Sequence, residues 1–159
     1  MKKILNSLDL VDPCVISAGT EIVNPQTGEV FWEFDIEPDS IKSILNICKS
    51  YPYELLVRDE LMGEGSPAAK HAISGPVNVM YLMQCVEEDA KIILDKLSQI
   101  STISASGVPS RTGKDIDIHI THREATKEHA IAKLLELIGV PKEKTIGVGD
   151  ANNDVHLFK

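Results

Sequence analysis

The sequence has 159 residues, of which 43% are hydrophobic, with a formal net charge of -8 and an isoelectric point near 5.1. This length and apolar content allow one domain, or one and a fraction, with a core of ordinary size. The acidic balance argues against nucleic-acid and anionic-membrane partners, because phosphate groups are bound by basic stripes.

Cysteine usage and the N-terminus bear on the compartment. The three cysteines, Cys14, Cys48 and Cys85, show no metal-ligand spacing. Their odd number and scatter favour reduced thiols in a cytoplasmic protein. No secretory leader or membrane span is expected, because polar residues such as Asn6 and Asp9 interrupt the apolar stretch behind the basic start.

Periodicity and turn residues predict alternating strands and helices. In chain order these are the end of a helix at 2–10, strands at 14–18, 21–23 and 29–36, a helix at 39–49, strands at 53–58 and 77–86, a helix at 87–97, strands at 101–106 and 114–120, a helix at 126–139 and a short apolar strand at 145–148. A loop is expected at 63–67. No repeat or coiled-coil heptad interrupts this order.

Three of these elements carry specific expectations. The strands at 21–23 and 29–36 should form a hairpin across Asn24-Pro25-Gln26-Thr27-Gly28. One face of its second strand should then hold Val30, Trp32, Phe34 and Ile36. The helix at 39–49 should begin at Asp39 as N-cap and turn its apolar residues inward, namely Ile41, Ile44, Leu45 and Cys48.

The strand at 114–120 alternates acidic and apolar residues. Asp115, Asp117 and His119 alternate with isoleucines, which predicts a half-buried strand whose three polar side chains face water. Asp115-Ile-Asp117 also has the spacing of a paired-carboxylate motif, but the solvated face is the favoured interpretation. His119, His122 and His129 match no known metal-ligand spacing.

The helix at 126–139 places a cation where it is locally unfavourable. Its apolar face comprises Ile131, Leu134, Leu135 and Ile138, and it should stop at Gly139. Lys127 lies in its first turn, where a positive charge interacts unfavourably with the helix dipole and costs roughly 0.3–1 kcal/mol. Such a placement suggests a negatively charged partner, although an ordinary solvated lysine is the commoner case.

The segment Gly147-Val-Gly-Asp-Ala-Asn-Asn-Asp154 follows the expected strand at 145–148. A parallel strand that opens into such a turn delivers its polar side chains to the carboxyl edge of a sheet. Asp150, Asn153 and Asp154 offer the hard oxygen ligands that Mg²⁺ prefers. An Asn-rich turn without a metal is equally compatible with these residues alone.

Together these segments resemble the C-terminal part of haloacid dehalogenase (HAD) superfamily phosphatases. The resemblance rests on three segments, namely Asp115-Ile-Asp-Ile-His-Ile120, Ala125-Thr-Lys127 with its helix, and Lys144-Thr-Ile-Gly-Val-Gly-Asp150 with Asn153-Asp154. Within the superfamily it is most similar to the Cof-type and sucrose-phosphatase-like members, which carry a large cap domain. Cys14-Val-Ile-Ser-Ala-Gly-Thr-Glu-Ile22 resembles the point where their chain enters the cap.

The resemblance implies an α/β, HAD-like fold in which an α+β cap is joined to an incomplete Rossmann-like core. Residues 1–20 would be a remnant of the core, 21–118 the cap, and 119–159 the C-terminal part of the core. The superfamily's nucleophile, the first Asp of an Asp-x-Asp-Gly-Thr motif, has no match in this sequence. The chain therefore looks like a fragment that needs a missing core segment or a second copy.

The implied parent activity is Mg²⁺-dependent hydrolysis of a small phosphorylated metabolite such as a sugar phosphate. Lys127 would bind phosphate oxygens, Asp150 would hold Mg²⁺, and Asn153 and Asp154 would support it. Substrate choice would lie in the cap, with Arg58, Lys70, Arg111 and Lys114 as candidates that are more often plain surface charges. The alternative is a non-catalytic, cap-like α+β module that binds a ligand or self-associates.

Overall fold

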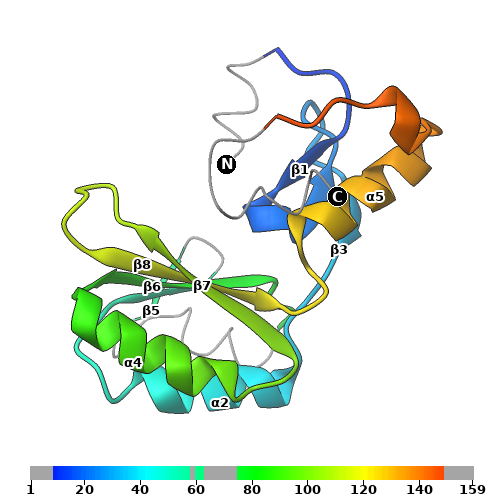
Figure 1. The fold of residues 1–159 in the computed structure, drawn as a ribbon. Helices are drawn as coiled ribbons and strands as arrows, with labels where there is room; N and C mark the ends of the chain where they lie inside the picture. The colour runs from blue at the N-terminus through cyan, green and yellow to red at the C-terminus, as the bar shows by residue number, and fades with distance from the viewer. Residues whose placement is uncertain (1–8, 58–59, 63–74, 149–159) are drawn as a thin grey trace. The chain divides into compact units, whose positions relative to one another are not determined.

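The computed structural model describes residues 9–57, 60–62 and 75–148, drawn as a ribbon in Figure 1. Two compact units divide the chain: Met1–Phe34 with Ala125–Lys159 forms the first, and Asp35–Glu124 forms the second. The chain thus passes from one unit to the other twice. The N-terminal hairpin groups with the first unit and residues 119–124 group with the second, while the cap at 21–118 stays a prediction.

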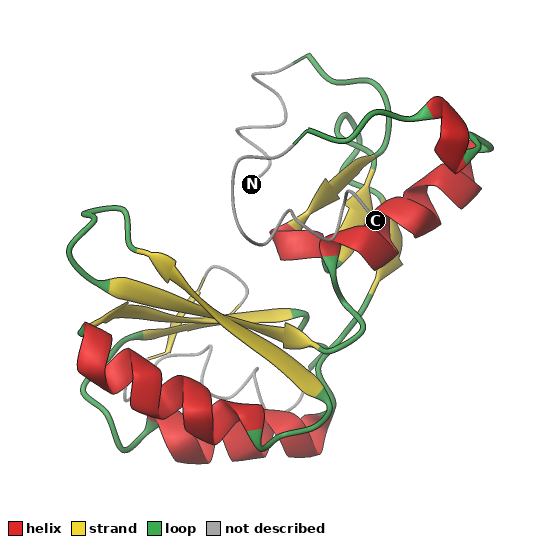
Figure 2. Cartoon of the chain, in the orientation of Figure 1, coloured by secondary structure: helices red, strands yellow, loops and turns green. Residues whose placement is uncertain are grey.

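The second unit is an antiparallel sheet with two helices. Its strands are β4 (Leu55–Val57), β5 (Glu60–Met62), β6 (Val79–Cys85), β7 (Ile103–Pro109) and β8 (Ile116–His122), in the order β5-β4-β6-β8-β7. The helices α2 (Pro38–Cys48) and α4 (Glu87–Ser98) lie on one face of this sheet (Figure 2). The predicted α+β arrangement, with helices starting near Asp39 and Glu87, is confirmed.

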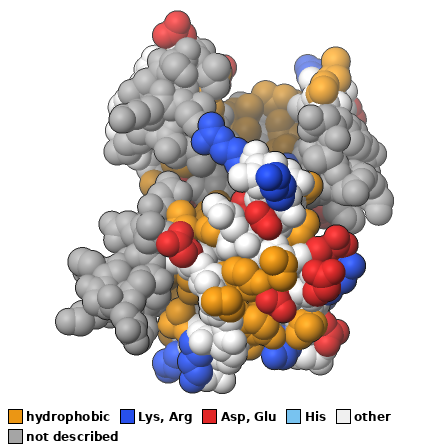
Figure 3. All heavy atoms as spheres, turned by 90° about the vertical axis from the view of Figure 1, so that its left-hand side faces the viewer, with side chains coloured by type: hydrophobic (Ala, Val, Ile, Leu, Met, Phe, Trp, Pro, Cys, Tyr) orange, Lys and Arg blue, Asp and Glu red, His pale blue; other side chains and the backbone are white. Residues whose placement is uncertain are grey.

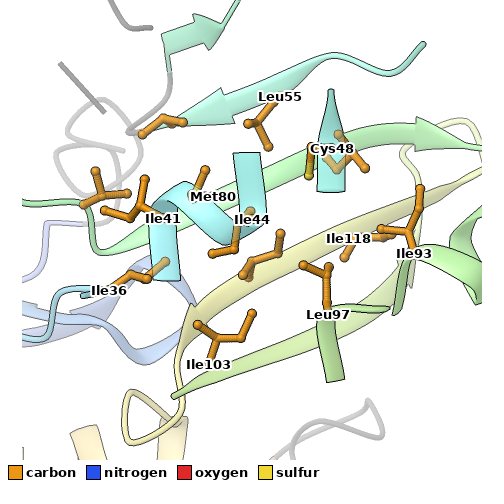
Figure 4. Packing of buried hydrophobic residues seen from close by; sticks show 14 of the residues in the cluster. Ile36, Ile41, Ile44, Cys48, Leu55, Met80, Ile93, Leu97, Ile103 and Ile118 are labelled. Carbon is orange, nitrogen blue, oxygen red and sulfur yellow. The ribbon is translucent and has the colours of Figure 1, made fainter. Parts of the chain in front are cut away.

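Apolar side chains from both layers form the core of this unit (Figure 4). Ile44 of α2, Ile93 of α4 and Ile118 of β8 each have 0% of their surface exposed. Burying a side chain of this size stabilises the fold by roughly 1.5–3 kcal/mol. The inward residues of α2 recur at the helical spacing predicted from the sequence, with Ile41, Ile44 and Cys48 buried and Leu45 packed against them.

The expected N-cap of α2 is wrong. Glu37 is the N-cap, and it makes no side-chain capping hydrogen bond. Pro38 occupies the first helical position, where its fixed φ and missing N–H suit the start of a helix. Asp39 therefore lies inside the first turn, where its carboxylate pairs with Lys42 Nζ at 2.9 Å.

The first unit contains a three-stranded antiparallel sheet and a helix. Its strands β1 (Cys14–Ile16), β2 (Glu21–Val23) and β3 (Val30–Glu33) lie in sequence order, with the 3-10 turn η1 (Ser17–Gly19) between the first two. The helix α5 (Lys127–Ile138) is followed by η2 (Lys142–Lys144) and contacts β1, η1 and β2. The predicted hairpin is confirmed, and its turn is held by the Asn24 side chain, which accepts hydrogen bonds from the N–H groups of Gln26 and Thr27 at 2.9 and 3.1 Å.

The second strand of the hairpin is shorter than predicted. β3 ends at Glu33, and Ile36 is 2% exposed within the core of the second unit instead of sharing a face with Val30. The Ile36 N–H donates to the Val77 carbonyl at 2.7 Å, a bond to the chain just before β6. A bulge between Ile22 and Val23 shifts the register against β3 and interrupts the strict alternation on which the prediction relied.

The strand expected at 145–148 does not form, although Thr145 has an extended backbone with φ of -113° and ψ of 153°. Ile146 is 92% exposed and Val148 is 87% exposed. A strand requires a hydrogen-bonded neighbour, and within the described residues this segment has none. The apolar run therefore carries the composition of a buried strand without the sheet that would bury it.

Exposed apolar side chains are concentrated in the first unit. Of the large hydrophobic residues that are exposed, those in the first unit are Leu10, Val11, Val30, Phe31, Leu137, Ile138, Ile146 and Val148, and those in the second are Val86 and Ile92. The predicted apolar face of α5 is only half-buried at Ile131, Leu134 and Leu135. The second unit thus holds most of the described hydrophobic core, while the first leaves much apolar surface uncovered.

Charged and apolar side chains are interspersed on the face of the molecule shown in Figure 3. The basic side chains visible there are scattered among acidic ones. Among the described residues, no helix has the length and apolar character needed to cross a bilayer.

Candidate active site

Lys127 is the first residue of α5, and local sequence explains why the helix starts there. Thr126 is the N-cap, with an extended backbone, and its side-chain oxygen accepts a hydrogen bond from the His129 N–H at 3.3 Å. At the other end, Gly139 closes the helix in the left-handed conformation, with φ of 68°. Lys127 is half-buried, in the helical turn where its positive charge is least favourable.

The turn between β1 and β2 lies against this helix start. Ser17, Ala18 and Gly19 have three consecutive positive φ angles, of 51°, 61° and 99°. Only glycine adopts such a backbone freely, so Ser17 and Ala18 each carry strain on the order of 1–3 kcal/mol. Strain of this kind persists only where the surroundings over-determine it.

Hydrogen bonds on both sides fix the turn. The Thr20 N–H and hydroxyl both donate to the Ser17 carbonyl, at 3.2 and 2.9 Å, and the Ser17 hydroxyl donates to the Glu21 carboxylate at 2.9 Å. The Phe34 N–H donates to the Thr20 carbonyl at 3.0 Å, which ties the turn to the end of the hairpin. Thr20 is 0% exposed, so its hydroxyl bond is made away from bulk water.

The turn and the helix start approach each other at their backbones. A Cβ on Gly19 would lie 2.7 Å from the Lys127 nitrogen and 2.8 Å from the Thr126 carbonyl carbon. No side chain fits at such distances, so only glycine allows this contact. The structure therefore brings together two segments of the predicted resemblance that are far apart in the sequence, 14–22 and the helix that begins at Lys127.

The three residues expected to hold a metal lie outside the described residues. These are Asp150, Asn153 and Asp154. Their carboxylate and amide oxygens are suitable Mg²⁺ ligands by chemistry alone. Elsewhere in the described chain, no group of three or more histidine, cysteine or acidic side chains is arranged to hold a metal ion.

The polar side chains in β8 and just before it are less exposed than expected. Asp115, Asp117 and His119 are half-buried instead of simply facing water. The Asp117 carboxylate accepts a hydrogen bond from the Gln84 N–H at 2.8 Å, at the point where β6 bulges against β8 and Gln84 takes a φ of 54°. The His119 ring meets the Tyr81 ring edge-on, with centroids 4.7 Å apart. The Asp117 carboxylate thus accepts a hydrogen bond from a backbone N–H at the bulge.

Of the four cationic candidates for substrate binding, the structure describes two. Arg58 and Lys70 lie outside the described residues. Arg111 and Lys114 are exposed in the turn between β7 and β8. The described structure gives neither of these two a special position.

The two cysteines of the second unit, Cys48 and Cys85, are not suited to act as nucleophiles. Burial raises the pKa of the Cys48 thiol to about 12 and, with nearby carboxylates adding to the effect, that of Cys85 to about 11. The thiolate is the reactive form of cysteine, so both side chains are inert core residues near neutral pH.

An ionisable cluster lies where the chain enters and leaves the second unit. Glu37 Oε1 is 3.1 Å from His122 Nε2, and His122 Nδ1 accepts a hydrogen bond from the Glu124 N–H at 3.0 Å. Burial pushes the pKa of Glu37 upward, but a backbone hydrogen bond and the bond with His122 outweigh burial and hold the pKa below its ordinary value. This contact is not predictable from the sequence, because Glu37 and His122 are far apart in the chain.

Comparisons with known proteins bear on the fold and the family. A haloacid dehalogenase-like hydrolase from B. subtilis is 15% identical, with a TM-score of 0.70, over 96% of this chain and 67% of its own length. Another haloacid dehalogenase-like hydrolase, from Bacteroides thetaiotaomicron, is 16% identical, with a TM-score of 0.74, over 98% of this chain and 66% of its own length. A sugar phosphatase of HAD subclass IIB is 18% identical, with a TM-score of 0.71, over 98% of this chain and 64% of its own length. At such identities these likenesses establish the fold alone.

The chain spans about two thirds of the length of these solved structures. No curated protein sequence matches it significantly. The family model of haloacid dehalogenase-like hydrolases matches residues 80–159, which is half of the chain and includes both Lys127 and the Gly-Asp-x-x-Asn-Asp segment. The fold and this match agree with the resemblance found in the sequence, and the chain belongs to the haloacid dehalogenase-like hydrolase family.

Proposed function

We propose that this chain is the cap and the C-terminal part of the core of a Mg²⁺-dependent phosphatase that acts on a small phosphorylated metabolite, with a sugar phosphate as the substrate class. The observation that carries the proposal is the position of Lys127, held at the start of α5 against the Ser17–Gly19 turn. The likeness to a subclass IIB sugar phosphatase supports the substrate class. Buried, unreactive thiols support a cytoplasmic location.

Lys127 is assigned to binding the oxygens of the phosphoryl group. Its ammonium would screen the negative charge that repels an attacking carboxylate, and it is held on a capped helix, so little reorganisation is needed. Asp150, Asn153 and Asp154 are assigned to the metal by their donor chemistry. When bound, Mg²⁺ neutralises phosphate charge as a Lewis acid.

In this proposal, catalysis requires a further polypeptide segment that supplies the nucleophile. No Asp-x-Asp-Gly-Thr nucleophile motif is present in the sequence. The exposed apolar residues of the first unit, above all Ile146 and Val148, support an interface that a further core segment would cover. In such an assembly the cap, approximated by the second unit, would select the substrate.

The test compares turnover of an aryl phosphate with Mg²⁺. The 159-residue chain alone should hydrolyse nothing above background, because it lacks the group that forms a covalent intermediate. A version extended by a core segment with an Asp-x-Asp-Gly-Thr strand should hydrolyse the aryl phosphate. In that version Lys127→Ala should reduce kcat by roughly 10²-fold or more, as removal of a single charge-stabilising donor does. Lys133→Ala, on the same helix and paired with Glu136, is the matched control. Asp150-dependent turnover by the chain alone would overturn the proposal and direct attention to Asp115 and Asp117.

A second function is favoured by one observation. The second unit contains the complete hydrophobic core cluster, so it has the packing of an independent module. On this reading the chain is a cap-like α+β module that binds a ligand or self-associates without catalysis. Failure of every extended version to turn over, combined with a stable dimer of the chain in analytical ultracentrifugation, would support this alternative.

A further inference from the structure

We infer that the Ser17–Gly19 turn is a positioning element that sets the first turn of α5, and through it the base of the Lys127 side chain. The inference rests on the phosphatase function proposed above and adds residues to which that function assigns no role. The geometry concerned lies entirely within the first unit.

The backbones of the turn and of the helix start lie very close together. Any side chain on Gly19 would overlap the Lys127 nitrogen and the Thr126 carbonyl carbon, at 2.7 and 2.8 Å. These are backbone atoms of the helix start, so they cannot rotate away as a flexible side chain would. An added Cβ must therefore displace Gly19, the helix start, or both.

The turn is held by hydrogen bonds to residues other than those of the helix start. The Ser17 carbonyl receives two bonds from Thr20, and the Ser17 hydroxyl is bonded to Glu21 on β2. Three positive φ angles in a row are kept only by such surroundings. The turn is thus a stiff support anchored in the sheet, and the helix start rests on it.

The position of the helix start matters for the charged side chain of Lys127. A lysine has four flexible methylene groups, so the location of its ammonium depends on how well its Cα is fixed. Misplacement by about 1 Å at a reacting group can reduce a rate by about 10²-fold. Gly19 acts through Lys127 and need not touch the substrate.

The experiment compares three glycine substitutions in the 159-residue chain. Gly19, Gly113 and Gly139 all have positive φ, of 99°, 70° and 68°, so alanine is strained at each. A Cβ at Gly113 or Gly139 meets nothing within 4 Å, and Gly139 caps the opposite end of the same helix. These two positions therefore control for strain without collision.

The first readout is amide NMR with hydrogen exchange. Gly19→Ala should shift the Lys127 and Glu128 amide signals and speed exchange at Ala130, whose N–H bonds to the Thr126 carbonyl at 2.9 Å. Gly139→Ala should perturb only the C-terminal turn of α5, and Gly113→Ala only the β7–β8 turn. If Gly19→Ala does not fold, Thr20→Val removes the hydroxyl bond to Ser17 while keeping the shape of the side chain, and should loosen the same amides. Unchanged first-turn amides in the folded variant would overturn the inference.

The second readout is a double-mutant cycle in the extended, active version. Gly19→Ala and Lys127→Ala should each lower kcat by more than 10-fold, and the double variant should be no worse than Lys127→Ala alone. A general folding defect would instead multiply the two losses. If Lys127→Ala has no effect, the proposed function fails. If Lys127→Ala lowers kcat and Gly19→Ala does not, only the positioning role fails.

Discussion

At the scale of single residues, the contact between Glu37 and His122 makes stability depend on pH. The pKa of Glu37 lies below its ordinary value of 4.5 in the folded chain, because hydrogen bonds favour its charged form more than burial disfavours it. A carboxyl group with a lowered folded pKa stabilises the fold fully above its unfolded pKa. This contribution is lost as the pH falls below 4.5 and through the folded pKa.

Glu37→Gln should therefore flatten the acid side of the stability profile. Free energies of unfolding in urea, measured from about pH 3 to pH 7, should fall less steeply below pH 4.5 in this variant than in the parent. The effect should be modest, because 47% of the Glu37 side chain is exposed and solvent screens the contact. Glu88→Gln, at an exposed position on α4, should leave the slope as in the parent. An unchanged slope in Glu37→Gln would exclude this carboxyl as a source of acid sensitivity.

The assigned metal residues give a second prediction at this scale. If the active site is completed by further polypeptide, then Asp150, Asn153 and Asp154 supply too few ligands to offset the dehydration of Mg²⁺. Isothermal titration of the 159-residue chain should accordingly show only weak binding, and Asp150→Ala should remove what remains. Asp95→Ala, on α4, serves as the control. Tight binding that survives Asp150→Ala would place the ion elsewhere.

At the scale of elements, the helix α2 is held by its buried face. Ile44 is 0% exposed in the core, and truncating such a side chain leaves a cavity as well as losing its burial. Ile44→Ala should lower the free energy of unfolding by about 2–5 kcal/mol in denaturant titrations. Ile92→Ala, at a position on α4 that is 50% exposed, should change it by about 0.5 kcal/mol or less. Similar losses in both variants would mean that α4 is covered in solution.

Elements whose signals are local were predictable from the sequence. The helix α5 follows from an apolar spacing of three and four residues and a terminal glycine, and both its start and its end were predicted within one residue. The presence of the strands β7 and β8 follows from alternating apolar residues, although β7 continues to Pro109, three residues beyond the predicted 101–106. These signals work because each depends only on residues that are neighbours in the chain.

Features that depend on distant partners were not predictable. The run at 145–148 has the composition of a strand, but whether it becomes one is decided by a neighbouring strand that the described residues do not supply. Ile36 continues the alternation of β3, yet it packs in the second unit, because its N–H pairs with Val77. The close approach of Gly19 to Lys127 joins residues over 100 positions apart. For the proposed site, Lys127 was predictable from the sequence, whereas its contact with Gly19 was not.

At the scale of the whole molecule, the two units differ in completeness. The second unit has the buried cluster, whereas the first exposes most of the large apolar residues that the described chain leaves uncovered. A domain that carries its own core can fold alone, while a sheet and helix with open apolar faces depend on what covers them. The chain should therefore unfold in two steps, and its less stable part should be the first unit.

The ends of the second unit show how it can be isolated. Glu37 and His122 are joined at 3.1 Å, so the places where the chain enters and leaves this unit are close together. The Ile36 N–H bonds to Val77 at 2.7 Å and the Arg123 N–H bonds to Thr102 at 2.8 Å, so both ends are tied into the unit. Residues 35–124 expressed alone should give a cooperatively folded domain, and its melting temperature should match the upper transition of the full chain. Ile44→Ala should lower both temperatures equally, because it removes the same packing in each. A segment that binds hydrophobic dyes and melts without a transition would mean that the second unit needs the first, and that the core in Figure 4 is not sufficient for its stability.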